Sequence, residues 1–316
     1  MFDEQEAKVL EIFNPGIVAT INKLVEDNRR FAYYTSADTA LKILKNRKLW
    51  FRNATVMNDF LEVTYGLDLI LDAFESQTGS KFIDAVESVS PGTMKKVREL
   101  FQGWMNDWKF ETYLACVSLH QESEDHIGRL SMWRAYGDTA LVINNTPMLK
   151  GTNDLGVFSL PVQYLSQKDY SERLDGIANA IDCNRDFLAL LGQENLIQNI
   201  HSMLFETAIA TKHPGFKEEQ EWRLYYRPNE QKSPVMDSQV EIVAGVPQLI
   251  YTLPLENDEQ NGLVGADIHE LLDQIIIGPT EYPYVREQAF KMVLSQTNVA
   301  ELSSKVFTSD IPIRTG

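Results

Sequence analysis

Short strand-like segments are scattered among longer helical patterns, and this arrangement most constrains the fold. Runs of apolar and β-compatible residues predict strands at 112–119, 139–145 and 221–226, whereas residues 60–108 and 167–212 have mainly helical patterns. A strict alternation of strands and helices would favour a doubly wound parallel sheet. Because the strands do not alternate strictly with helices here, the sequence predicts an α+β fold.

The length of 316 residues fits one large domain or two ordinary ones, and a hydrophobic content of 44% is enough for a substantial core. We expect an N-terminal helical segment at 1–30, broken near Pro15-Gly16. A single domain should follow at 31–316, with helical insertions near 60–108 and 167–212. No Gly-rich phosphate loop follows any predicted strand, so a Rossmann or P-loop fold has no support.

Charge and cysteine content limit the classes of function. A net charge of −16 argues against broad, non-specific binding of nucleic acid, although a local basic groove or a basic protein partner stays open. Cys116 and Cys183 lie in no CxxC or Cys/His cluster, which predicts neither a disulfide framework nor a metal site and fits a reducing cytoplasm. No apolar run approaches the roughly 18 residues of a membrane span, so we expect no membrane partner.

The segment HPGFKEEQEWRLYYR at 213–227 sets charged residues at alternate positions of a predicted strand. Alternate residues share one face of a strand, so Glu219, Glu221 and Arg223 should point one way and Trp222 and Leu224 into the core. One interpretation is an edge strand that its charges keep soluble, with Arg223 paired to a neighbouring carboxylate. The other is a carboxylate pair for proton transfer, or for stabilising an oxocarbenium-like transition state at a glycosidic bond.

Four segments in order resemble a widespread bacterial domain family of formerly unknown function. Its hallmarks are Tyr-Thr-Ser before a helix, Asn-Asp after the second strand, a Ser-Leu strand followed by Met-Trp-x-x-Tyr, and Lys…Glu-x-Glu-Trp-Arg. The matching segments here are FAYYTSADTALKILKNRKLWFRNATVMND (31–59), CVSLHQESEDHIGRLSMWRAYGD (116–138), ALVINN (140–145) and KHPGFKEEQEWRLYY (212–226). For Asn58-Asp59, a helix cap and a loop that closes a pocket are both open interpretations.

That family in turn resembles the ADP-ribosyltransferase superfamily, and its opening is similar to that of DNA-modifying toxin transferases. The resemblance implies a split, mixed β-sheet core with helical insertions, and NAD as a substrate without a metal. Segments 31–35, 113–119 and 221–226 should then be strands of one split sheet. Glu221 corresponds to the catalytic glutamate of the Glu-x-Glu motif, and Glu219 would orient or deprotonate the acceptor.

The resemblance also implies the residues that bind NAD. Tyr33 stands where those toxins carry histidine, and its hydroxyl can replace an imidazole donor. The other implied positions are Thr35 beside it, Ser118 on the second strand, Tyr136 as a ring for nicotinamide, and Arg52 or Arg134 for the phosphates.

The function implied is a bacterial toxin or phage-defence effector that modifies RNA, DNA or protein, with an antitoxin or chaperone protein as a plausible partner. A phage-triggered transferase that modifies RNA is the specific expectation. Two alternatives stay open. The same carboxylates could serve an NAD glycohydrolase or nucleosidase with water as acceptor, or the chain could be a non-catalytic binding module of the same fold.

Overall fold

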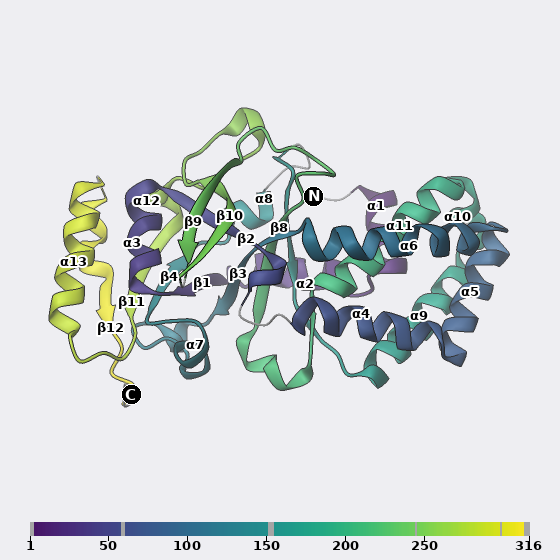
Figure 1. The fold of residues 1–316 in the computed structure, drawn as a ribbon, viewed down its shortest axis with the longest axis horizontal. Coiled ribbons are helices and arrows are strands. Elements are labelled where there is room, and N and C mark those ends of the chain that lie inside the picture. Colours follow the sequence, from purple (N-terminus) through teal and green to yellow (C-terminus); the bar gives the residue numbers. More distant parts are fainter. Residues whose placement is uncertain (1–2, 58–60, 151–154, 244, 298, 313–316) are drawn as a thin grey trace. The chain divides into compact units, whose positions relative to one another are not determined.

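The computed structural model describes residues 3–57, 61–150, 155–243, 245–297 and 299–312 (Figure 1). The chain forms two compact units, and each is described by itself. The helical unit consists of residues 1–24, 59–111 and 160–217. The sheet unit consists of residues 25–58, 112–159 and 218–316. Asn58 and Asp59, the predicted cap or loop, lie outside the described residues.

The helical unit is built from long amphipathic helices. Its helices are α1 (Glu4–Phe13), most of α2 (Ile17–Glu26), α4 (Leu61–Phe74), α5 (Gln77–Val89), α6 (Thr93–Phe110), α9 (Gln167–Cys183), α10 (Arg185–Leu191) and α11 (Gln193–Ile209). Helix α5 packs on α9, and α11 packs on α4 and α6 (Figure 1). A short parallel pair, β6 (Gln163–Tyr164) and β7 (Thr211–Lys212), completes the unit. The helices predicted at 60–108 and 167–212 are therefore confirmed.

The sheet unit holds the strands of one large mixed sheet. These are β1 (Arg30–Thr35), β2 (Lys48–Asn53), β3 (Tyr113–His120), β4 (Thr139–Ile143), β5 (Val157–Pro161), β8 (Glu221–Tyr226), β9 (Asp237–Val243), β10 (Val246–Pro254), β11 (Leu272–Ile277) and β12 (Val306–Thr308). Its helices are α3 (Ala37–Asn46), α7 (Leu130–Ala135), α8 (Thr146–Lys150), α12 (Ile268–Leu271) and α13 (Pro283–Gln296).

The sheet runs in the order β12-β11-β4-β1-β3-β2-β10-β9, with β8 on β3 and β5 on β8. Strands β11 and β12 pair in parallel, whereas β1, β2 and β8 all pair with β3 in antiparallel. Segments 31–35, 113–119 and 221–226 are thus strands of one sheet, as expected. The α+β class and the mixed character of the sheet are confirmed.

Local chemistry fixes the elements that lead to the site. Ser36 caps α3, since its side chain accepts a hydrogen bond from the Thr39 amide, as expected for serine at this position. Gly137 follows α7 with φ +141, and a Cβ there would lie 2.4 Å from the Thr35 backbone. Only glycine allows this approach, which holds the end of α7 against the end of β1.

One predicted feature of the sheet is wrong. Strand β8 is not an exposed edge strand, because it lies between β3 and β5 and most of its residues are buried. Sequence pattern does not show which strands will flank a given strand, since the partners come from distant parts of the chain.

Candidate functional site

The central sheet forks beside β3. On one edge of β3, β1 pairs with residues 118–120 and β2 pairs with residues 113–114. Strand β8 occupies the other edge along 113–118. Strands β1 and β2 therefore share one edge and diverge from each other at the middle of β3, next to Cys116. We call this place the fork.

Tyr33 lies at the fork, one residue beyond the register that β1 shares with β3. Its side chain is half-buried, whereas the neighbouring Tyr34 is buried against Trp133 with ring centroids 4.8 Å apart. Burial raises the pKa of the Tyr33 phenol to about 12; the charge of Cys116 adds to the rise, and Arg52 and a hydrogen bond with Thr35 oppose it. Tyr33 therefore keeps its proton at neutral pH and can act as a hydrogen-bond donor.

Arg52 reaches the fork from β2. Its Nε donates to Gln248 Oε1 at 3.0 Å and its Nη2 donates to the Val56 carbonyl at 2.7 Å. Burial lowers the pKa of Arg52, and the nearby Tyr33 and Cys116 oppose this. Arg134, the alternative phosphate ligand, lies exposed on α7. The charge of Arg52 therefore acts on the Tyr33 phenol, whereas Arg134 lies at the surface of α7.

A buried ion pair occupies β8. The Glu221 side chain is 5% exposed and the Arg223 side chain 0% exposed, with Arg223 Nε 2.7 Å from Glu221 Oε1. A solvated charged face would leave both groups in water. The interpretation of this segment as a soluble edge is therefore wrong, and its charges belong to the interior of the sheet unit.

Ser118 joins this pair to β1. It lies directly opposite Ala32 on one side and Glu221 on the other. Neighbouring strands are about 4.8 Å apart, so the backbones of Ala32 and Glu221 are separated by roughly 10 Å. Tyr33 follows Ala32 on β1, so Tyr33 and Glu221 lie on strands that pair with opposite edges of β3. The Ser118 hydroxyl itself lies 3.6 Å from Met132 Sδ.

Glu219 is not part of the strand that was predicted to carry it. It ends the 3-10 helix η4 (Pro214–Glu219), and Gln220 then adopts the left-handed region with φ +46. The Leu119 amide donates to the Gln220 carbonyl at 2.9 Å and holds this turn. Because a left-handed residue interrupts the two-residue alternation, Glu219 and Glu221 do not project as a simple same-face pair.

The Glu219 carboxylate is instead oriented by Tyr136. Glu219 is 7% exposed, and the Tyr136 hydroxyl donates to its Oε1 at 3.0 Å. Tyr136 is the residue that ends α7, and Gly137 holds this end near Thr35. Tyr136 thus contacts the first glutamate of the Glu-x-Glu motif through its hydroxyl.

Arg129 is the residue that the sequence reasoning missed. It donates to the carbonyls of Glu218 at 2.9 Å, Glu219 at 2.8 Å and Leu119 at 2.7 Å, and its Nε lies 2.6 Å from Glu124 Oε1. Arg129 therefore fixes the backbone on both sides of Glu219. The only signal was an arginine just before a short helix, and the Glu218 and Glu219 carbonyls that it binds lie about 90 positions later in the chain.

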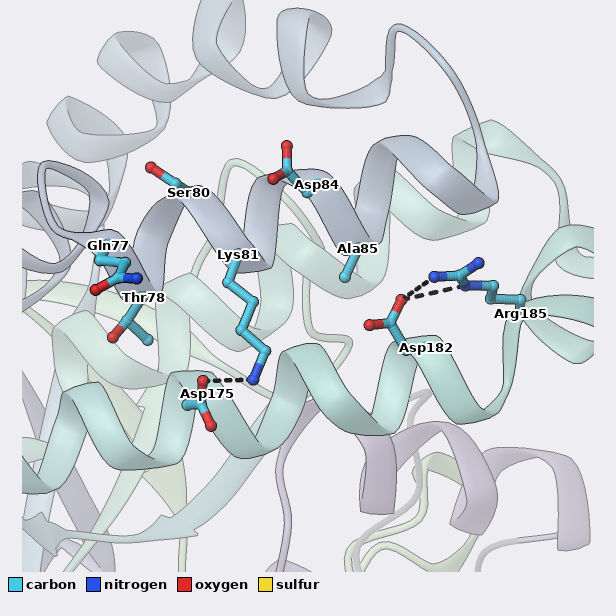
Figure 2. A pocket seen from close by; sticks show the side chains of 9 residues that line it. All are labelled: Gln77, Thr78, Ser80, Lys81, Asp84, Ala85, Asp175, Asp182 and Arg185. Atoms are coloured by element: carbon cyan, nitrogen blue, oxygen red, sulfur yellow. Dashed lines mark hydrogen bonds and ion pairs between the residues drawn. The ribbon is translucent and has the colours of Figure 1, made fainter.

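A separate groove of about 640 Å³ lies in the helical unit between α5 and α9 (Figure 2). Its cationic groups are already paired: Lys81 Nζ lies 2.6 Å from Asp175, and Arg185 Nη2 lies 2.6 Å from Asp182. Its remaining lining residues are Gln77, Thr78, Ser80, Asp84 and Ala85. None of the predicted site residues lines this groove.

Within the described part of the chain, no three His, Cys, Asp or Glu side chains come together as metal ligands. None of the helices described there is both long enough and apolar enough to cross a bilayer.

Comparison with models of protein families gives a match. A family model described as "Protein of unknown function (DUF2971)" matches residues 132–224. The matched span includes Tyr136, Glu219 and Glu221, whereas Tyr33 and Arg52 lie before it. No curated protein and no solved structure matches the chain. The similarity is therefore to a family whose own function is not described, over less than a third of this chain.

Proposed function

We propose that this chain is an NAD-dependent ADP-ribosyltransferase whose reacting centre lies around the fork. The observation that supports this most is the buried pair of Glu221 and Arg223. Burying an ion pair costs desolvation and is an inefficient way to stabilise a fold. A carboxylate held in one orientation inside the protein is well suited to stabilise a positive charge that develops in a transition state.

In the proposed reaction, the bond between nicotinamide and ribose C1′ breaks, and nicotinamide leaves with the electron pair. Glu221 faces the resulting oxocarbenium and stabilises its charge. A nucleophilic atom of the acceptor then bonds to C1′, and Glu219 takes the proton that this atom loses. Tyr136 orients Glu219 for this step, which its 3.0 Å hydrogen bond supports.

We assign the binding of NAD to residues near the fork. Tyr33 is a neutral donor for a ribose or amide group, because its pKa of about 12 keeps it protonated. Arg52 is the candidate for the phosphates, since its charge lies close to Tyr33. Ser118 and Thr35 flank these groups and supply hydroxyls.

The proposed biological role is that of a bacterial toxin or phage-defence effector in the cytoplasm, with an antitoxin or chaperone protein as partner. RNA, DNA and protein are the acceptor classes to be distinguished. A net charge of −16 disfavours non-specific phosphate contacts, so a nucleic-acid acceptor would have to be bound through a local surface.

The test is incubation of the protein with adenine-labelled NAD and a bacterial lysate, followed by separation of RNA, DNA and protein. Label bound to one of these fractions is the expected result. Label only in free ADP-ribose would identify an NAD glycohydrolase, and no turnover together with no NAD binding would identify a binding module. Glu218→Gln is the matched control for substitutions of Glu219 and Glu221 in this assay, because Glu218 is an exposed carboxylate in the same segment.

A further inference from the structure

Strand β9 forms an open end of the large sheet. Among the strands that the structure describes, its one neighbour is β10, and their register runs without a shift from Asp237↔Thr252 to Val243↔Val246. Proteins usually protect such edges with charged side chains, lysine above all, with proline or with a bulge. The sequence of β9, Asp-Ser-Gln-Val-Glu-Ile-Val, contains no lysine or proline, and its charged residues are Asp237 and Glu241. An uninterrupted strand of this length is a template for pairing with another strand.

One face of the β9–β10 hairpin is apolar and exposed to solvent. Val240 is 70% exposed and Ile242 65% exposed, and they lie opposite Leu249 at 45% and the exposed Pro247. The opposite face carries Gln239, Glu241, Gln248 and Ile250, which are less exposed. A contiguous exposed apolar surface marks an interaction site rather than an ordinary solvated face.

We propose that β9 pairs in antiparallel with β9 of a second copy of this chain, about a twofold axis at Val240. In an antiparallel hairpin, the residues that flank a two-residue turn hydrogen-bond to each other, and every second residue along the strand does the same. Val243 and Val246 flank the turn here. Ser238, Val240 and Ile242 therefore direct their backbone N–H and C=O groups to the open edge.

Repulsion between carboxylates favours one register of the proposed β9–β9 pair. With Val240 opposite Val240 of the second copy, Ser238 lies opposite Ile242 and Glu241 lies opposite Gln239. If the second copy is shifted by two residues in one direction, Glu241 lies opposite Glu241 of the second copy. If it is shifted by two residues in the other direction, Glu241 lies opposite Asp237 of the second copy. Like charges directly opposite each other destabilise a strand pair. The register centred on Val240 is thus the one in which the edge is complementary to itself, as a twofold interface requires.

The expected dimer is weak and depends on salt. Pairing at a hairpin edge buries less than the about 800 Å² per partner of a standard interface. Each copy also carries a net charge of −16, so added salt should strengthen association by screening the repulsion. This inference does not depend on the proposed transferase activity.

The first measurement is the mass in solution, by sedimentation and light scattering at low and high protein concentration and at two salt concentrations. We expect the mass to rise from 36.0 kDa towards twice that value as protein and salt increase. Val240→Lys should abolish the rise, because it places two cations opposite each other. Val246→Lys is the matched control, since Val246 is 51% exposed but lies on β10. A monomeric mass under every condition would overturn the proposal.

Disulfide trapping tests the register in a Cys183→Ser background, which removes the exposed native thiol. Opposed residues in a hydrogen-bonded antiparallel pair have Cα atoms about 5.5 Å apart, within the disulfide range. Val240→Cys should therefore cross-link two copies under mild oxidation. Ile242→Cys should not, because its two copies are displaced by four residues, or roughly 13 Å. Ser238→Cys combined with Ile242→Cys should cross-link again. Equal cross-linking by the Val240→Cys and Ile242→Cys variants would contradict the proposed interface.

Discussion

The hydroxyl of Tyr136 donates a hydrogen bond to Oε1 of Glu219 at 3.0 Å, although 83 residues separate the two in the sequence. Tyr136 ends α7 and Glu219 ends η4, so the contact joins the two segments that carry the proposed acceptor chemistry. Among the contacts of the two glutamates of the Glu-x-Glu motif, the Tyr136 hydroxyl donates to Glu219 and the Arg223 guanidinium donates to Glu221. These contacts are consistent with the separate roles proposed for the two carboxylates.

Tyr136→Phe should change the balance between transfer and hydrolysis of NAD. The variant keeps the ring and removes one hydrogen bond to a carboxylate, a contact of about 1.5–3 kcal/mol. We expect transfer to the acceptor to fall about tenfold or more, with NAD cleavage less affected, and Glu219→Gln to shift the ratio in the same direction. Quantifying modified acceptor and free ADP-ribose in one assay measures this. An equal loss of both products would contradict this assignment, because the Tyr136 hydroxyl would then act on the cleavage of NAD itself.

Glu221→Gln should lower NAD cleavage and transfer together, by about 10²–10³-fold, because the amide lacks the charge needed opposite the oxocarbenium. The buried position of Arg223 adds a second effect. Removing one charge of a buried pair typically costs about 3–5 kcal/mol, so the variant should also melt at a lower temperature.

A double variant separates the two effects of Glu221→Gln. Adding Arg223→Met removes the buried charge and should recover much of the melting temperature, since apolar replacements of buried pairs are often neutral. Activity should stay low. Trp222→Ala is the stability control: Trp222 is 2% exposed and packs edge-on against Phe31, so its loss should cost about 3–5 kcal/mol. If activity returned with stability in the double variant, the Glu221 carboxylate would be structural.

Arg129→Lys should shift the backbone at Glu219 while leaving the Glu219 carboxylate in the protein. Lysine cannot bind three carbonyls and a carboxylate in the planar geometry of a guanidinium. We expect transfer to fall as in Glu219→Gln, and little further loss when the two substitutions are combined, because both act on the same step. Hydrogen exchange should rise in the peptides that cover 214–220 and Leu119. Arg185→Lys, which alters an ion pair with Asp182 in the helical unit, is the control.

Gln220→Gly should stabilise the protein slightly. Gln220 has φ +46, a region that glycine adopts without the steric cost of a Cβ, although glycine also loses more backbone entropy on folding. The expected net change is a gain of up to about 1 kcal/mol with transfer retained, whereas Gln220→Val should lose stability because a β-branched residue fits this region poorly. Denaturant unfolding of the two variants checks the order. A more stable valine variant would contradict the backbone argument.

Stability of the helical unit should depend on pH through Glu206. Burial raises the pKa of Glu206 to about 7, with the charge of Arg173 opposing the rise. The unfolded chain binds this proton with a pKa of about 4.3, so the folded state holds the proton more tightly. The Glu206 contribution to the free energy of unfolding is therefore greatest at low pH, and it falls as pH rises from about 4.3 to about 7. Glu206→Gln should remove this fall, as measured by denaturant unfolding of wild type and variant at pH values on both sides of this window.

The sequence by itself determined the elements whose causes are local. Ser36 marked the start of α3, Pro15-Gly16 marked the break between α1 and α2, and runs of apolar residues marked β3 and β8. Helix caps, helix breaks and the periodicity of buried residues depend on residues a few positions apart. They can therefore be predicted without knowledge of the fold. The candidate residues of the site were found in the same way, from motifs.

Only the tertiary structure decided how those residues are arranged. The neighbours of β8 on both sides, the contacts of Arg129 with Glu218 and Glu219, and the contact of Tyr136 with Glu219 all join distant parts of the chain. The alternation rule also assumes that a strand is uninterrupted, and the left-handed backbone of Gln220 breaks it between the two glutamates. Which carboxylate is buried with an arginine and which is held by a tyrosine therefore follows from packing between segments, because no local pattern encodes it.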